Sequence, residues 1–136
     1  MTIVIVNELE QKVRQIKKAF INDIDIEFEV FNKYTPFVLS YIKLNKIDVV
    51  ITEIEFDNEI NLNYLRWISK FSEKTKLIVQ TSSKNWRHEN QCRKLGVKYF
   101  FYESSSISVL KNFVMDISYI LQNLKSINRN FYSIYI

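Results

Sequence analysis

The sequence is poor in glycine, proline and cysteine, with one residue of each among its 136 positions, and it contains one histidine. The single glycine, Gly96, excludes a P-loop, a dinucleotide-binding fingerprint and a nucleophile elbow, because each of these motifs requires several glycines. Cys92 has no second cysteine with which to form an internal disulfide, and one histidine does not complete a zinc site of cysteine and histidine ligands. We therefore expect no bound cofactor, no metal site and a reducing, cytoplasmic setting.

Long apolar runs are also missing from the sequence. No run approaches the ~20 residues that a membrane-spanning helix requires, and no basic segment precedes the short apolar stretch at the start. We expect neither a transmembrane helix nor a signal peptide, and no contact with a membrane. A content of 47% hydrophobic and 25% charged residues instead indicates one compact, folded domain.

Charge is unevenly distributed along the chain. Residues 1–68 contain 8 Lys/Arg and 11 Asp/Glu, whereas residues 69–136 contain 11 Lys/Arg and 4 Asp/Glu. The basic residues of the second half are spread over predicted helices and form no dense cluster interleaved with aromatic residues. Direct nucleic-acid binding is therefore not expected.

Apolar periodicity predicts five strands alternating with five helices. The strands are expected at residues 3–6, 24–31, 47–54, 76–83 and 98–102, and the helices at 9–20, 36–44, 62–71, 86–95 and 107–124. The strand over 24–31 alternates apolar with acidic residues, which is typical of a sheet edge. Thr35 and Pro36 predict the start of the second helix. Strands separated by helices require crossover connections, so we expect a mostly parallel sheet that is covered on both faces.

Polar residues follow the predicted strands at their carboxyl ends, where open parallel sheets bind ligands. Asn7 and Glu8 follow the first strand, Glu53 closes the third, Thr81 closes the fourth, and Glu103 follows the fifth. Residues 1–124 are expected to form the domain around this rim. The remaining residues, 125–136, are expected to form a tail in which no reliable period is found.

Several segments, taken in order, resemble the receiver domain of two-component response regulators. They are IVIVNELE, IDVVITEIEF, LRWISKFSEKTKLIVQTSS and CRKLGVKYFFYESSS, and the resemblance covers roughly residues 2–124. It is closest to receivers that precede a helix-turn-helix output domain. The resemblance implies a flavodoxin-like, CheY-like α/β fold, a doubly wound five-stranded parallel sheet of (βα)5 type.

The resemblance also assigns roles in the phosphoacceptor pocket. It places Asn7 and Glu8 at the magnesium-binding acids, Glu53 at the phosphoacceptor aspartate, Thr81 at the phosphate-contacting hydroxyl, Glu103 at the lysine, and Phe100 at the switch aromatic. Four of these five pocket positions differ from the family. Glutamate is one methylene longer than the aspartate it replaces, and Glu103 reverses a charge. One like-charge contact at ~5 Å and an effective dielectric of ~20 costs roughly 3 kcal/mol, so we expect a degenerate pocket.

Three interpretations of Glu8, Glu53 and Glu103 stay open at this point. They are solvated acids without a ligand, ligands for a divalent cation, or a partly protonated cluster. We expect the protein not to be an enzyme. The leading hypothesis is a phosphorylation-independent pseudo-receiver that acts in signal transduction or transcription regulation through protein contacts. The alternatives are a working phosphoacceptor receiver with unusual pocket residues and a flavodoxin-like cofactor-binding protein.

The predicted fourth helix carries a candidate partner surface. Residues 84–98 contain Trp86 and five basic residues, which are Lys84, Arg87, Arg93, Lys94 and Lys98, against one acid, Glu89. In the family, the face made by the fourth helix, fifth strand and fifth helix commonly mediates dimerisation or partner docking. We therefore expect a protein partner here, such as a response regulator, a kinase or a transcription factor. A homodimer through this face and an ordinary solvated helix are the alternatives.

Overall fold

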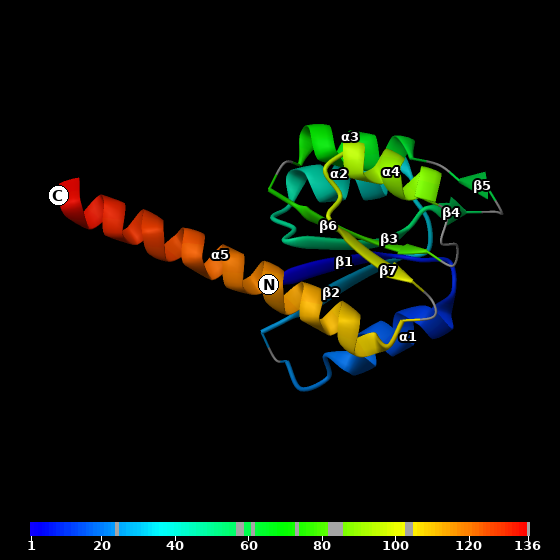
Figure 1. Cartoon of the computed structure of the whole chain (residues 1–136), viewed down its shortest axis with the longest axis horizontal. Helices are drawn as coiled ribbons and strands as arrows, with labels where there is room; N and C mark the ends of the chain where they lie inside the picture. The colour runs from blue at the N-terminus through cyan, green and yellow to red at the C-terminus, as the bar shows by residue number, and fades with distance from the viewer. Residues whose placement is uncertain are drawn as a thin grey trace.

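A computed structural model describes residues 1–23, 25–56, 59–60, 62–72, 74–81, 86–102 and 105–135, with the backbone alone given for 56, 59–60 and 124–135. The strands are β1 (Thr2–Val6), β2 (Glu27–Phe31), β3 (Val49–Glu53), β4 (Glu55–Phe56), β5 (Glu59–Ile60), β6 (Lys76–Thr81) and β7 (Tyr99–Tyr102). The helices are α1 (Glu10–Ala19), α2 (Pro36–Leu44), α3 (Asn63–Phe71), α4 (Trp86–Lys94) and α5 (Ile107–Tyr135). One face of the main sheet is covered by α2, α3 and α4, and the other by α1 and α5 (Figure 1).

The main sheet has five parallel strands in the order β2-β1-β3-β6-β7. This is the doubly wound arrangement expected from the sequence, with its switch point between β1 and β3. The edge position of β2 is confirmed; residue 24, its predicted start, lies outside the described residues, and residues 25 and 26 precede the strand. Asp23 and Ile26 lie in turns, and the ladder to β1 begins at Glu27. The antiparallel hairpin formed by β4 and β5, which are strands of two residues each, was not predicted.

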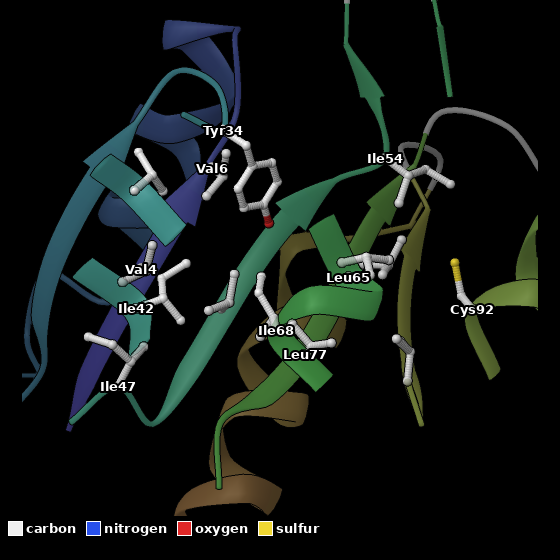
Figure 2. Close-up of a cluster of buried hydrophobic side chains, with 14 of the residues drawn as sticks. Val4, Val6, Tyr34, Ile42, Ile47, Ile54, Leu65, Ile68, Leu77 and Cys92 are labelled. Carbon is white, nitrogen blue, oxygen red and sulfur yellow. The ribbon is translucent and has the colours of Figure 1, made fainter. Parts of the chain in front are cut away.

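Two apolar clusters fill the space on either side of the sheet. Val4 and Val6 of β1 belong to the cluster under α2, α3 and α4, which Figure 2 shows, whereas Ile3 and Ile5 belong to the cluster under α1 and α5. Successive strand residues point to opposite faces. The continuous β-branched run of β1 is therefore buried on both faces of the sheet.

The sequence explains two local features of the fold. The Thr35 hydroxyl accepts a hydrogen bond from the Val38 amide at 3.2 Å and caps α2, with Pro36 in the first turn. Gly96 follows α4 with φ +95°, a left-handed conformation that side chains with a Cβ rarely adopt. The turn from α4 to β7 therefore requires this single glycine.

The last helix is much longer than predicted. α5 has 29 residues, a length of about 43 Å, and its backbone is helical across the expected boundary between residues 124 and 125. Its C-terminal half extends away from the layered body (Figure 1). Among the described residues, no helix is long and apolar enough to cross a membrane.

Candidate functional site

The candidate site lies where β1, β3 and β6 end, at the switch point of the sheet. Asn7 directly follows β1, and strand register pairs Glu53 of β3 with Gln80 of β6. Alternation along each strand explains which way these polar residues point. Ile51 and Ile78, two residues before Glu53 and Gln80, belong to the cluster under α1 and α5. The three polar side chains therefore lie on the α1 and α5 face of the sheet.

Asn7 connects the three strands through its side chain. It is buried, its Nδ2 donates to Gln80 Oε1 at 3.1 Å and to Glu53 Oε1 at 3.5 Å, and its Oδ1 accepts from the Leu9 amide at 2.8 Å. Buried amide groups are stable when both ends are hydrogen-bonded in this way. Asn7 therefore uses both its donor and its acceptor inside the protein.

Lys12 of α1 completes the arrangement. Its Nζ lies 3.0 Å from Glu53 Oε1, and the two side chains are only 14% and 12% exposed. A cleft of about 330 Å³ adjoins the pair between α1 and α5, with Lys12, Gln80 and Ser105 in its lining. The protein thus supplies its own cation to the Glu53 carboxylate.

Sequence reasoning identified Asn7 and Glu53 but missed Lys12 and Gln80. The available signals were positional: Lys12 lies in the first turns of the helix that follows β1, and Gln80 precedes Thr81 at the end of a buried strand. A polar residue within an apolar strand indicates a buried hydrogen-bonding role. Lys12, by contrast, resembled any basic residue on a solvated helix face.

Two of the three acids considered together in the sequence lie within the described residues. Glu8 is exposed, Glu53 contacts Lys12 and Asn7, and Glu103 lies outside the described residues. Within the described ranges, no group of three His, Cys, Asp or Glu side chains is arranged to hold a metal ion. The arrangement of Glu53 favours an internal ion pair over a solvated acid.

Thr81 and Phe100 lie on the other face of the sheet. Thr81 is 5% exposed and Phe100 is 8% exposed, and both line a small cavity beside Cys92 of α4. The Arg93 guanidinium lies over the Phe100 ring, with its Cζ 4.7 Å from the ring centroid. The Phe100 ring is therefore inside the protein and is covered by a charged residue of α4.

A second buried hydrogen-bond chain supports the end of β3. The Tyr34 hydroxyl donates to Thr52 Oγ1 at 2.7 Å, and Thr52 Oγ1 donates to the Glu53 carbonyl oxygen at 2.8 Å. Tyr34 also stacks on Tyr64, with 4.5 Å between ring centroids. Burial raises the pKa of Tyr34 well above its usual range, so its hydroxyl stays protonated and can donate. Sequence reasoning did not identify this chain.

The candidate partner surface on α4 consists of exposed residues, which we call the α4 surface: Trp86, Arg87, Arg93, Lys94 and Lys98. Lys84 lies outside the described residues. Trp86 is 65% exposed, and the Arg87 Cζ lies 5.5 Å from its ring centroid. Arg93 also forms an ion pair with Glu89 at 3.0 Å. An exposed tryptophan beside arginines has the composition of an interface anchor.

Cys92 faces the interior of the protein rather than the α4 surface. Its side chain is fully buried, and burial, with a smaller contribution from the Glu89 charge, raises the pKa of its thiol from 9.0 to about 11. Glu89 also raises the pKa of Tyr102, after the larger effect of burial. Cys92 therefore has the properties of a structural residue.

No protein-family model matches the sequence, and no curated protein matches it. A response regulator from Thermotoga maritima shares 21% identity at a TM-score of 0.74, over 85% of this chain and 95% of that chain. The response regulatory domain of protein mrkE from Klebsiella pneumoniae shares 16% identity at a TM-score of 0.77, over 90% and 99%.

A third similar structure is a DNA-binding response regulator of the LuxR family from Staphylococcus aureus. It shares 18% identity at a TM-score of 0.72, over 85% of this chain and 97% of that chain. At these identities the likeness concerns the fold, not the activity. The chain has the fold of response-regulator receiver domains, as the order and spacing of its segments predicted.

Proposed function

We propose that this protein is a pseudo-receiver, a receiver-like domain that acts through protein contacts and does not depend on phosphorylation in its pocket. The ion pair between Lys12 and Glu53 carries the proposal. In the receiver family, the residue at the position of Glu53 is an aspartate that takes up a phosphoryl group. Here that carboxylate is neutralised by a lysine of the same chain and removed from most of the solvent.

The hydrogen bonds of Asn7 support the same proposal. Magnesium binds oxygen ligands and prefers carboxylates, with several waters retained. Asn7 presents an amide nitrogen to Glu53 and Gln80, and its only side-chain oxygen accepts from the Leu9 amide. Metal binding at this position would require these bonds to be exchanged, without the negative charge that an aspartate would bring.

The surroundings of Phe100 support the proposal that the α4 surface has a single, constant conformation. The ring is buried and its outer side is covered by Arg93, which is itself paired with Glu89. A cation over an aromatic face contributes roughly 0.5–1 kcal/mol at an exposed site. We propose that the α4 surface keeps one arrangement because Phe100 is already packed inward.

The charge of the α4 surface favours an acidic protein partner over a second copy. A two-fold symmetric contact would bring the same basic helix of both copies together, and like charges across an interface reduce affinity. An acidic partner would be attracted, with Trp86 and Arg87 as anchoring residues. We propose that this contact serves signal transduction or transcription regulation.

The experiment is a pull-down from native cells with the wild-type chain and two charge-reversal variants. R87E/K94E reverses two charges of the α4 surface and leaves Arg93 on Phe100. K17E/K18E makes the same change in net charge on exposed positions of α1 and is the matched control. We expect R87E/K94E to lose the partner and K17E/K18E to retain it. Equal recovery of the partner by both variants, with unchanged thermal unfolding, would exclude the α4 surface as the site of partner binding.

A further inference from the structure

A second surface lies at the opposite end of the sheet from the candidate site. A groove of about 600 Å³ runs between α5 and the loop that joins α1 to β2, where the strands begin. Its lining includes Asp23, Asp25 and Asp48 on one side and Met115, Ser118 and Gln122 of α5 on the other. We call it the base groove. Nothing in the proposed function uses it.

The loop side of the base groove is negatively charged. Lys46 and the amino terminus are the positive groups in its lining, and the amino terminus donates to the Asp25 carbonyl oxygen at 2.8 Å. Lys111 lies 4.0 Å from the Asp23 carboxylate, and the described residues include no ion-pair partner for Asp25. The Asp48 carboxylate accepts from the Thr2 amide at 2.9 Å, so the exposed Asp25 is the carboxylate of this rim that a basic segment can approach most directly.

The helical segment of α5 beyond the body, residues 124–135, has the complementary composition. It contains Lys125 and Arg129, and no acidic residue occurs from position 117 to the end of the sequence. Apolar residues recur at alternating intervals of four and three, at Ile120, Leu124, Ile127, Phe131 and Ile134. This spacing is typical of a helix that packs against another helix. The first member, Ile120, is 43% exposed on the body of the protein.

We propose that residues 124–135 of a second copy of this chain occupy the base groove, and that the two α5 helices pack antiparallel about a two-fold axis. The wall of the groove is formed by α5 residues 114–122, directly before the segment. A two-fold axis close to residue 123 therefore places both segments in both grooves, which gives a closed, self-complementary interface.

The dimensions agree with this arrangement. Twelve helical residues are about 18 Å long, and the stretch 114–122 is about 13 Å long, so one segment spans the whole groove of its partner. A copy cannot fill its own groove, because α5 is one continuous helix whose end leads away from the body (Figure 1). Charge complementarity and apolar spacing both favour the second copy as occupant.

The test measures the mass of the full chain in solution by light scattering and sedimentation. The wild type is expected to have the mass of two 16.4 kDa chains. K125E/R129E makes the segment acidic, and D23K/D25K makes the groove rim basic. Each variant alone then places like charges in both halves of the interface, and we expect self-association to weaken at least about tenfold. R87E/K94E, on the α4 surface, is the control and should remain a dimer.

An equimolar mixture of the two charge-reversal variants gives the sharpest result. Each groove of the mixed dimer faces a segment of opposite charge, so we expect the dimer to return. The proposal is overturned if the wild type is a monomer at high micromolar concentration, if either reversal variant dimerises as well as the wild type, or if the mixture stays monomeric. A monomeric wild type that sediments with phosphatidylserine vesicles would assign the segment to a membrane surface instead.

Discussion

Lys12 Nζ lies 3.0 Å from Glu53 Oε1, and neither side chain has more than 14% of its surface exposed. This contact joins the first helix to the third strand, at the carboxyl ends of the parallel strands. Both charged groups of such a buried pair lose hydration. Their mutual attraction offsets this cost only while both partners are present. The Glu53 carboxylate is therefore neutralised by a charge of the protein itself.

Removing one partner of this pair should destabilise the fold more than removing both charges. We expect K12M to lower the free energy of unfolding by about 3 kcal/mol, because it leaves the Glu53 carboxylate buried without its cation. K12M/E53Q keeps the oxygen that accepts from Asn7 and should be more stable than K12M by about 1 kcal/mol or more. Urea unfolding measures both values. Equal losses in the two variants would show that the ion pair contributes little.

Magnesium should bind the wild type weakly, because Asn7 is uncharged and Lys12 already neutralises Glu53. N7D/K12A restores one carboxylate and removes the competing cation, so we expect its affinity for magnesium to rise at least about tenfold. N7D with Lys12 retained is the control and should gain less. Calorimetric titration gives the three affinities. Low-micromolar binding by the wild type would contradict this account of the pocket.

The buried chain from Tyr34 to the Glu53 carbonyl oxygen should contribute measurably to stability. T52V replaces the hydroxyl with a methyl group of similar size and takes away the acceptor of Tyr34, so we expect a loss of about 1–3 kcal/mol. Y34F removes the same hydrogen bond but leaves Thr52 donating to the Glu53 carbonyl oxygen, and should cost about 1 kcal/mol. Chemical denaturation compares them. Wild-type stability in both variants would mean that the hydrogen bond is replaced by water.

Cys92 should react slowly with thiol reagents at neutral pH. Its pKa of about 11 keeps the thiol protonated, since the reactive thiolate forms only as the pH approaches that value, and the side chain is fully buried. The folded state holds this proton more tightly than the unfolded chain, so stability falls as the pH rises from about 9 towards 11. Labelling with a chromogenic disulfide at pH 7, with and without denaturant, checks the first point. Rapid labelling of the folded protein would contradict the burial of Cys92.

The fold was predictable because its strands and helices have clear apolar periods and short connections. Three features of the fold were not predictable from the sequence. The two-residue strands β4 and β5 are too short to show a period, and β2 begins late because Ile26 packs against the core from a turn. The helix beyond residue 124 was missed because aromatic residues such as Tyr132 and Tyr135 fall between the apolar positions and obscure their spacing.

The candidate site was predictable only in part. Asn7 and Glu53 follow from the rule that polar residues at strand ends mark a site in a parallel sheet. Lys12 does not follow from this rule, because its sequence neighbours are those of a solvated helix. Only the packing of α1 on the sheet brings its ammonium group to Glu53. The position of Arg93 over the Phe100 ring is likewise a contact between α4 and β7 that no local pattern encodes.

The most direct test of the pocket is intact-mass spectrometry after incubation with acetyl phosphate and magnesium, with partner recovery measured on the same samples. We predict no added phosphoryl group, since Glu53 is engaged by Lys12 and Asn7, and equal partner recovery with and without acetyl phosphate. Stoichiometric phosphorylation that is lost in E53Q, accompanied by a change in partner recovery, would contradict the account.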